Sequence, residues 1–244
     1  MIPDPARLNR SAALLLALGT AMGAAQAARP LNDTGMTQCL VNGQLTKECA
    51  GTGQDAEFGR DVTKKNKNDG AKGFAYAKVC NSGEVAGSGA CPADPALGAG
   101  ANEWACTLDK VSNLIWEVKT KSGLRSWKTS YTSVGDGRPG DSSEFVAQVN
   151  AQGLCGANDW KLPTQVQLQG LVHYGVAYPG PTIDKNWFPY TASDNPPEVP
   201  GTYWTADVYA VQQSAAFVVF FQFGGVGASM LEAANRVRLV RAAH

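Results

Sequence analysis

The sequence predicts an α+β domain that is rich in loops and held together by disulfides. Two segments near the middle of the chain, 141–152 and 164–172, carry apolar residues at helical spacing. Apolar runs over 202–206, 215–223 and 236–241 follow them and have the composition of β-strands. Six cysteines lie downstream of an apolar N-terminal segment. That context favours disulfides over free thiols.

A secretory signal peptide is predicted over residues 1–27. Arg7 and Arg10 form a short basic region, a stretch of small apolar residues follows, and Ala25-Gln26-Ala27 is a typical cleavage site. A retained anchor helix is the alternative, but the apolar stretch is shorter than the ~20 residues that a membrane span needs. We therefore expect a secreted protein that does not span the membrane and resides in the periplasm or at the cell surface.

The charge balance argues against nucleic acid as a partner. The chain has 21 Lys and Arg residues against 21 Asp and Glu residues. Binding to nucleic acid needs a basic field that neutralises phosphates, and a neutral chain does not supply one. Composition leaves the oligomeric state open.

The six cysteines permit fifteen pairings, and local sequence favours one set. That set is Cys39 with Cys49, Cys80 with Cys91, and Cys106 with Cys155. The first pair flanks Asn42-Gly43, which is a hairpin turn signal, and the second flanks a Gly/Ser-rich loop. The third would then be the long-range bridge. The chain has two histidines and no Cys-x-x-Cys, so a zinc site or a redox motif is disfavoured.

Residues 28–103 are predicted to form a loop-rich N-terminal arm or subdomain, with one candidate strand over 73–79. A basic run within it could bind an anionic ligand through Lys64, Lys65 and Lys67. Calcium is the other functional interpretation, but the spacing does not match an Asp-x-Asn-x-Asn loop. A solvated turn is the simplest interpretation, and no cofactor is predicted.

Both predicted helices have recognisable ends. Asp141 or Ser142 can cap the first, and Gly153 should stop it. Thr164 and Gln167 have the spacing of a capping box at the start of the second. These local signals place two helices between the cysteine-rich half of the chain and its C-terminal strands.

The strand predictions differ in how much of each segment should be buried. The run over 114–118 is strand-like, and 215–223 is apolar on both faces, which predicts a central strand. Alternation over 236–241 predicts that Arg236 and Arg238 point outward. Outward arginines could contact an acidic ligand or form surface ion pairs.

Five short blocks form a pattern with a distinctive order and spacing. They are Leu114-Ile115-Trp116-Glu117, the Gly153–Thr164 block with its Asp-Trp-Lys-Leu-Pro-Thr end, Ile183-Asp184 with Phe188-Pro189, Tyr203-Trp204-Thr205, and Val237-Arg238-Leu239-Val240-Arg241. Together they resemble the Lcl C-terminal domain family, which is named for the Legionella collagen-like adhesin. The resemblance sets a domain boundary at 104–244.

The resemblance implies a C-type-lectin-like or sulfatase-modifying-factor-like fold, with two helices packed on small twisted antiparallel sheets. Members are mostly secreted bacterial proteins, and the named adhesin is associated with sulfated glycosaminoglycans. This chain lacks that adhesin's collagen stalk. It also lacks the Glu-Pro-Asn and Gln-Pro-Asp tripeptides with which true C-type lectins bind sugar and calcium. Calcium therefore has no motif to support it.

The central block indicates fold more than chemistry. Trp160 is expected to fill the core beside the Cys106–Cys155 bridge, and Asp159 to accept hydrogen bonds in the turn. His173 is expected to pack or cap rather than to act as a base, because no nucleophile or carboxylate is paired with it. No catalytic residue is predicted.

In a lectin-like fold, recognition is expected in the loops between the late strands. These are 207–214 and 229–235. The candidate ligand-binding residues there are Asp207, Tyr209, Gln212, Gln213, Ser229, Glu232 and Asn235. Tyrosine offers a flat amphipathic contact, and the amides offer adaptable hydrogen bonds.

Three functions are consistent with these features. The first is a recognition or adhesion module that binds a glycan, sulfated or not, or a protein surface. The second is a structural accessory of an envelope or pilus assembly. The third, an enzyme of the formylglycine-generating type, requires two reactive cysteines and is disfavoured by the paired set above.

Overall fold

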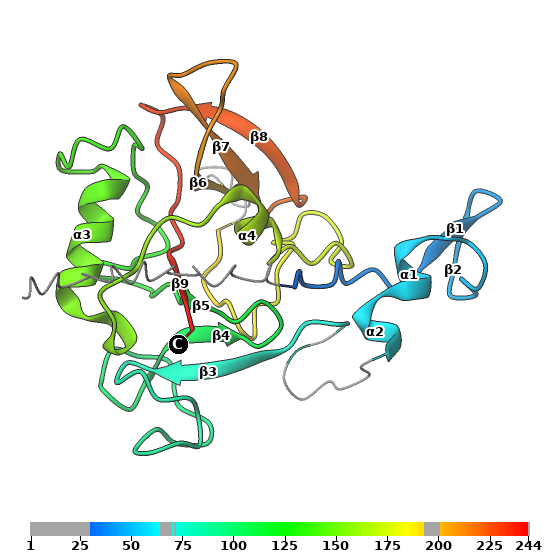
Figure 1. Cartoon of the computed structure of the whole chain (residues 1–244), viewed down its shortest axis with the longest axis horizontal. Coiled ribbons are helices and arrows are strands. Elements are labelled where there is room, and N and C mark those ends of the chain that lie inside the picture. The colour runs from blue at the N-terminus through cyan, green and yellow to red at the C-terminus, as the bar shows by residue number, and fades with distance from the viewer. Residues whose placement is uncertain (1–29, 64–69, 71, 193–200, 244) are drawn as a thin grey trace, which may run out of the picture.

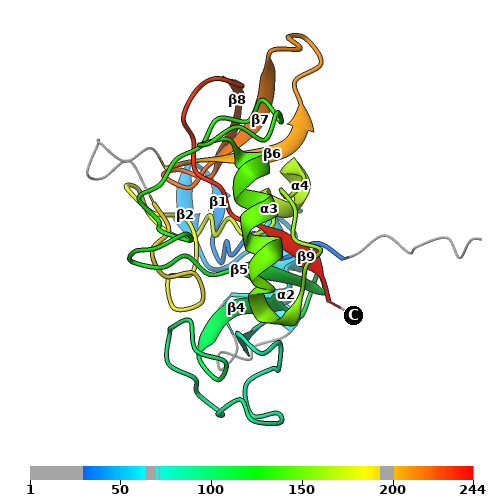
Figure 2. The ribbon, with the colours of Figure 1, turned by 90° about the vertical axis from the view of Figure 1, so that its left-hand side faces the viewer.

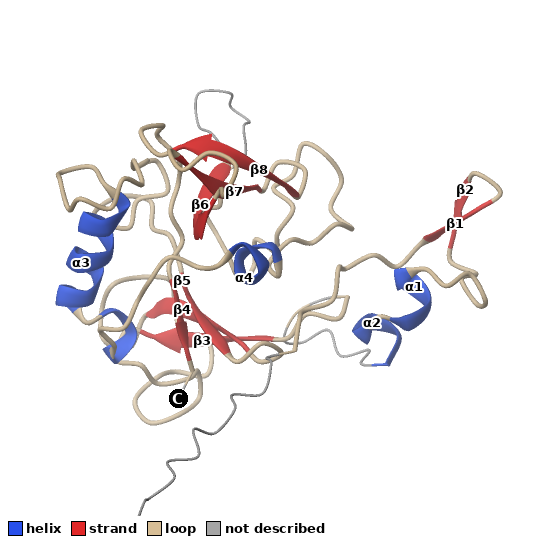
Figure 3. Ribbon diagram, turned by 45° about the horizontal axis from the view of Figure 1, so that its top comes forward, coloured by secondary structure: helices blue, strands red, loops and turns tan. Residues whose placement is uncertain are grey.

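The computed structural model describes residues 30–63, 70, 72–192 and 201–243. Two antiparallel sheets and two helices form the body, and a smaller arm extends from one side of it (Figures 1 and 3). The prediction of a loop-rich α+β fold is thus confirmed. The predicted signal peptide over 1–27, together with Lys64, Lys65 and Lys67, lies outside the described residues.

The larger sheet has four strands in the order β3-β4-β5-β9, and every pairing is antiparallel. Its strands are Tyr76–Cys80 (β3), Trp104–Asp109 (β4), Leu114–Glu117 (β5) and Val240–Ala242 (β9). β5 matches the strand predicted over 114–118, whereas β4 lies where none was predicted. β3 comes from the segment predicted as an arm, so part of that segment is hydrogen-bonded into the body.

The smaller sheet has the order β6-β7-β8. Its strands are Thr202–Val208 (β6), Ala215–Phe220 (β7) and Gly225–Met230 (β8). β7 is central, as its double-sided apolar pattern predicts. The third strand of this sheet is β8. The strand predicted over 236–241 is confirmed only at its end, where Val240 and Arg241 begin β9 of the larger sheet. Glycines at two of its six positions give β8 a weak strand signal, and pairing with β7 overrides it.

Both body helices begin where the sequence predicts, and α3 also ends there. Asp141 caps Ser142–Gln152 (α3) by accepting from the Ser143 N–H, and Gly153 ends the helix with φ 64°. Thr164 and Gln167 form both bonds of the capping box of Gln165–Gln169 (α4). α4 is shorter than the predicted 164–172. A single 3₁₀ turn, Leu154–Gly156 (η1), follows α3.

The core has two parts, which lie on opposite faces of β6 and β7. Trp204 and Val218 face the part that holds the Cys106–Cys155 bridge, while Tyr203 and Val219 face the other. Neighbouring residues of a strand point to opposite faces, and this accounts for a strand that is apolar throughout. Trp160 is buried beside the disulfide, as predicted, and its Nε1 donates to the Leu154 carbonyl at 2.9 Å.

The two arginines predicted to point outward are buried, with exposed fractions of 4% for Arg236 and 0% for Arg238. Their segment runs between the two sheets. Arg236 bridges to Tyr203 of β6, and the Leu239 carbonyl accepts from the N–H of Glu117 in β5. Alternating apolar and charged residues predict a solvent-facing side only when one side of the strand is exposed to water. Here both sides of the segment are covered by protein.

A buried charge cluster, made of Glu117, Lys119, Arg125 and Arg238, lies beside this segment. Lys119 Nζ is 2.8 Å from Glu117 Oε1, and Glu117 Oε2 accepts the Leu239 N–H at 3.0 Å. Arg238 donates to the Glu117 carbonyl at 2.7 Å. Burial lowers the pKa of Lys119 to about 8, although Glu117 acts in the opposite direction. Glu117 thus supplies the one carboxylate of a cluster that contains three cationic side chains.

The arm contains a hairpin and two single-turn helices. They are Cys39–Val41 (β1), Gln44–Thr46 (β2), Asp55–Phe58 (α1) and Arg60–Thr63 (α2). Asn42 and Gly43 both have positive φ, as a two-residue hairpin turn requires. Neither helix buries a residue, and Leu45 and Phe58 are 63% and 69% exposed. Little apolar burial therefore holds the arm together.

The three predicted disulfides are all present, Cys39–Cys49, Cys80–Cys91 and Cys106–Cys155, and no cysteine is free. The first closes the arm, and the third ties β4 to η1 across 49 residues. No helix in the described ranges is long and apolar enough to cross a membrane.

Candidate functional site

Three loops meet at one end of the body and form what we call the loop face, residues 132–140, 207–214 and 229–235. The Ser133 N–H donates to Leu231 O at 2.8 Å, and the Leu231 N–H donates to Ser214 O at 2.8 Å. Tyr131 and Asn235 exchange two backbone hydrogen bonds, of 2.8 and 3.0 Å. Figure 2 shows the 132–140 loop above the N-terminal end of α3 and near the β6–β7–β8 sheet. The two predicted recognition loops are thus joined through their backbones, together with a third.

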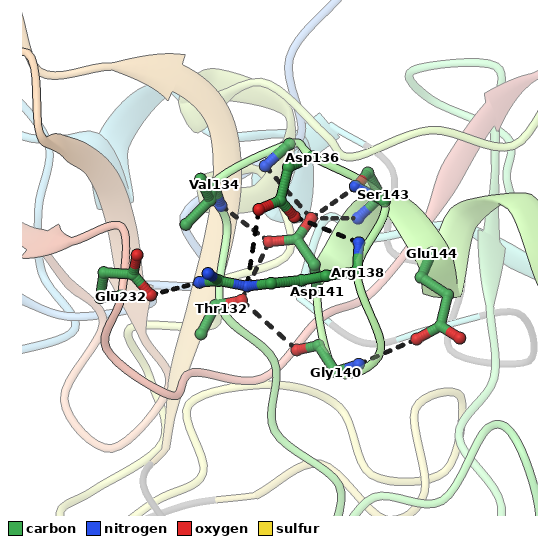
Figure 4. Close-up of polar contacts among 11 residues, drawn as sticks. Thr132, Val134, Asp136, Arg138, Gly140, Asp141, Ser143, Glu144 and Glu232 are labelled. Carbon is green, nitrogen blue, oxygen red and sulfur yellow. Dashed lines mark hydrogen bonds and ion pairs between the residues drawn. The ribbon is translucent and has the colours of Figure 1, made fainter.

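Asp141 organises the third loop (Figure 4). Its carboxylate accepts the backbone N–H groups of Val134 at 2.8 Å and Gly135 at 3.2 Å, and the Thr132 hydroxyl at 2.9 Å. The same carboxylate caps α3 through Ser143. Burial alone would raise the pKa of Asp141, but these hydrogen bonds to its ionised form outweigh burial and lower it. One side chain therefore fixes the loop to the helix.

Replacing Asp141 should loosen this loop. We expect Asp141→Ala to lower the free energy of unfolding by about 2 kcal/mol at pH 7, because several hydrogen bonds to a charged acceptor are lost. The folded pKa lies below the unfolded value, so the wild-type advantage is full above pH 4 and is lost as pH falls through the folded pKa. Urea unfolding at pH 7 and pH 3 measures both. Asp136→Asn is the matched control in the same loop, and an equal loss there would contradict the assignment.

An ion pair crosses the loop face. Arg138, from the 132–140 loop, donates to the Glu232 carboxylate, and its Nε lies 3.7 Å from Asp136 Oδ2. The Arg138 and Glu232 side chains are 41% and 69% exposed. Exposed pairs contribute at most ~1 kcal/mol, so a ligand can displace this one at little cost.

The structure divides the predicted binding residues into two groups. In the first group, Asp207, Ser229 and Asn235 are hydrogen-bonded within the protein at half-buried or buried positions. Asp207 accepts the Gln165 N–H at 2.6 Å, at the start of α4, and Asn235 is buried and donates to Ser229 Oγ at 2.9 Å. These bonds hold the loops in position. Lys64, Lys65 and Lys67 lie outside the described residues.

The other four are available at the surface to different degrees. Gln212, Gln213 and Glu232 are exposed. Tyr209 is half-buried, and its ring packs edge-on against Phe217 with centroids 5.3 Å apart. Gln212 also approaches the Met230 sulfur at 3.2 Å. The outward set is thus two amides, one carboxylate and one supported aromatic ring.

Sequence reasoning missed the apolar residues of this face. Val211, Val208 and Met230 are 84%, 60% and 47% exposed. All three lie inside the predicted recognition loops, 207–214 and 229–235, but the candidates chosen there were polar residues and Tyr209. Arg138 was missed because it stands alone in a Gly-rich segment, 135–140, that carries no binding motif.

His173 has the packing role expected of it. It is 6% exposed, its Nδ1 accepts the Gly175 N–H at 3.1 Å, and its ring lies against Phe74. Burial, followed by the nearby Lys72, lowers its pKa. It lies apart from the loop face.

Comparison with known proteins gives one family match. The family model of the Lcl C-terminal domain matches residues 105–241, which is more than half of the chain. No curated protein and no solved structure matches. The matched range runs from the second residue of β4 to the second residue of β9 and includes the whole loop face. The chain therefore belongs to the Lcl C-terminal domain family.

Proposed function

We propose that this protein is a secreted bacterial recognition module that binds a glycan or a protein surface through the loop face. The observation that carries the proposal is the backbone coupling of three loops at one end of the β6–β7–β8 sheet, with Val211, Gln212 and Gln213 exposed on them. A rigid scaffold with variable surface loops is a common arrangement for binding.

The chemistry of the face fits a ligand with both polar and apolar surface. Val208, Val211 and Met230 offer apolar area, while Gln212 and Gln213 offer donors and acceptors. If the ligand is a sulfated glycan, Lys64, Lys65 and Lys67 are the proposed additional anchors, and retention on heparin should weaken steeply with salt.

Disulfides bear on the compartment and on the enzyme alternative. Three bridges suit an oxidising compartment outside the cytoplasm, and we place the protein in the periplasm or at the cell surface. Formylglycine-generating chemistry needs two reactive thiols, and all six cysteines are paired. A structural role in an envelope or pilus assembly remains the second candidate, because the same face could dock on a neighbouring subunit.

The loop face is tested with the most exposed of its apolar residues. We expect Val211→Asp to lower retention on a glycan array, or capture of a surface protein partner, at least tenfold, because it places a charge at the centre of the contact. Val166→Asp, on α4 and 55% exposed, is the matched control. Both variants should unfold at the wild-type temperature.

The arrays are run with and without calcium and at two salt concentrations. A discrete protein partner without any glycan signal would favour the assembly role. Equal binding by Val211→Asp and wild type would remove the loop face as the binding site.

A further inference from the structure

A cavity lies away from the loop face, at the C-terminal end of α3. Its volume is about 400 Å³, within the range of roughly 300–1,000 Å³ that holds small-molecule ligands. The loop face adjoins the other end of α3, and eleven helical residues separate the two by roughly 16 Å. The lining of the cavity includes Asn81, Ala99, Thr120, Ser122, Arg125 and Gln152.

Arg125 is a wall of this cavity and is only 7% exposed. Its Nη1 donates to the Ala105 and Val118 carbonyls at 3.0 and 2.7 Å, which fixes the guanidinium plane. Within the described ranges, no acceptor bonds its Nε or Nη2, and no carboxylate lies within 4.0 Å of it. Neither nitrogen is among the sealed, unsatisfied atoms, so the free N–H groups reach open space. A pre-oriented donor fork is therefore available to a ligand.

The surrounding charge favours an anion. Arg125 belongs to the buried charge cluster, whose single carboxylate, Glu117, is already bonded to Lys119. Buried charges are normally neutralised by partners, and this cluster retains a surplus of positive charge. An anion beside Arg125 would balance it.

The C-terminal end of α3 disfavours an anion in this cavity, but its effect is weaker than that of Arg125. A helix C-terminus carries roughly half a negative elementary charge, whereas the guanidinium carries a full positive one. The N–H of Gly153 already bonds the Asn150 carbonyl. The charge of Arg125 therefore dominates the cavity.

Some of the other polar groups that line the cavity are hydrogen-bonded within the protein, and others are exposed. Asn81 donates to Ala99 O and accepts from the Cys155 N–H, and Thr120 donates to Ser122 O. The side chains of Ser122 and Gln152 are exposed at the rim. A ligand with hydroxyl groups next to its anionic group could use both.

We propose that this cavity binds the carboxylate of a hydroxylated organic acid of about monosaccharide size, with Arg125 as its anchor. The planar fork of Arg125 matches a carboxylate in two parallel hydrogen bonds. The site is separate from the loop face, and its failure would leave the proposed function untouched.

Titration calorimetry on the mature full-length protein, with glucuronate as the probe and glucose as its neutral counterpart, tests the proposal. We expect saturable one-to-one binding of glucuronate and no binding of glucose. Arg125→Lys should weaken binding at least tenfold, because an ammonium cannot form the fork.

A second variant covers the case in which Arg125→Lys misfolds. Ala99→Tyr adds bulk at the exposed rim and leaves the Arg125 bonds in place, so it should abolish binding without lowering the unfolding temperature. Lys128→Gln removes a nearby exposed lysine outside the cavity and should bind like wild type. Undiminished binding by Ala99→Tyr, or equal binding of glucose, would overturn the proposal.

Discussion

Replacing Glu117 by Gln should lower the free energy of unfolding by about 3–5 kcal/mol, the usual cost of removing one partner from a buried ion pair. Glutamine keeps the shape and can still accept the Leu239 N–H, so the loss reports the charge itself. What remains is Lys119, Arg125 and Arg238 buried without a carboxylate. Chemical denaturation at pH 7 measures the difference.

The same substitution should change the dependence of stability on pH. The pKa of Lys119 is about 8 in the folded protein and near 10.5 when unfolded. The unfolded chain therefore holds the extra proton between these values, and this group makes stability rise with pH across that window. The negative charge of Glu117 is the largest effect that raises the pKa of Lys119. Without it, the folded-state pKa of Lys119 should fall below 8, and the rise in stability with pH should begin at a lower pH.

Two further variants separate this account from a loss of packing. Adding Lys119→Met to Glu117→Gln should remove the rise in stability between pH 8 and 10. Glu232→Gln, whose carboxylate is 69% exposed, should cost no more than ~1 kcal/mol. A comparable loss in Glu232→Gln, or no pH effect in Glu117→Gln, would contradict the role assigned to the buried charge cluster.

Features encoded over a few neighbouring residues were predictable. The Asp141 cap, the Thr164–Gln167 capping box and the Asn42-Gly43 turn all formed as expected, because each depends on hydrogen bonds within one turn. The disulfides followed, since two of them close short loops and leave a single choice for the third. The double-sided apolar pattern of β7 also identified it as central.

Features that depend on tertiary pairing were not predictable. β8 has glycines where a strand signal would be expected, and only its register with β7 makes it a strand. Arg236 and Arg238 alternate like a surface strand, but the segment that carries them is covered on both sides. Arg125 was not identified from the sequence, because its position in the cavity is set by the carbonyls of Ala105 and Val118, which lie 20 and 7 residues away.

The sequence predicted the loops of the candidate site but not their individual contacts. The lectin-like resemblance placed recognition at 207–214 and 229–235, and the structure joins these loops to each other. Which side chains point outward depends on their hydrogen bonds. Asp207 and Asn235 are polar loop residues in the sequence, yet both are bonded inside the protein. Val211, which is apolar, is the most exposed of the group.

Removing the Cys106–Cys155 disulfide should be the second large effect. Its loop spans 49 residues, for which the chain-entropy relation gives about 4 kcal/mol. Cys106 is fully buried, so alanine is the appropriate replacement at both positions. For a chain of this length we expect the unfolding temperature of the double variant to fall by about 10 °C. Calorimetry on the oxidised protein measures it.

The Cys39–Cys49 bridge provides the matched comparison. Its loop is short, with a separation of 10 residues, and the same relation still assigns it about 3 kcal/mol. The two arm helices bury no residues, however, so opening this bridge should loosen the arm without lowering the unfolding temperature of the body. Proteolysis should then cleave the arm first in the Cys39→Ala and Cys49→Ala variant. Equal loss of thermal stability in the two double variants would show that the arm and the body unfold as one unit. Opening a disulfide in the arm can lower the unfolding temperature of the body only if the two unfold cooperatively.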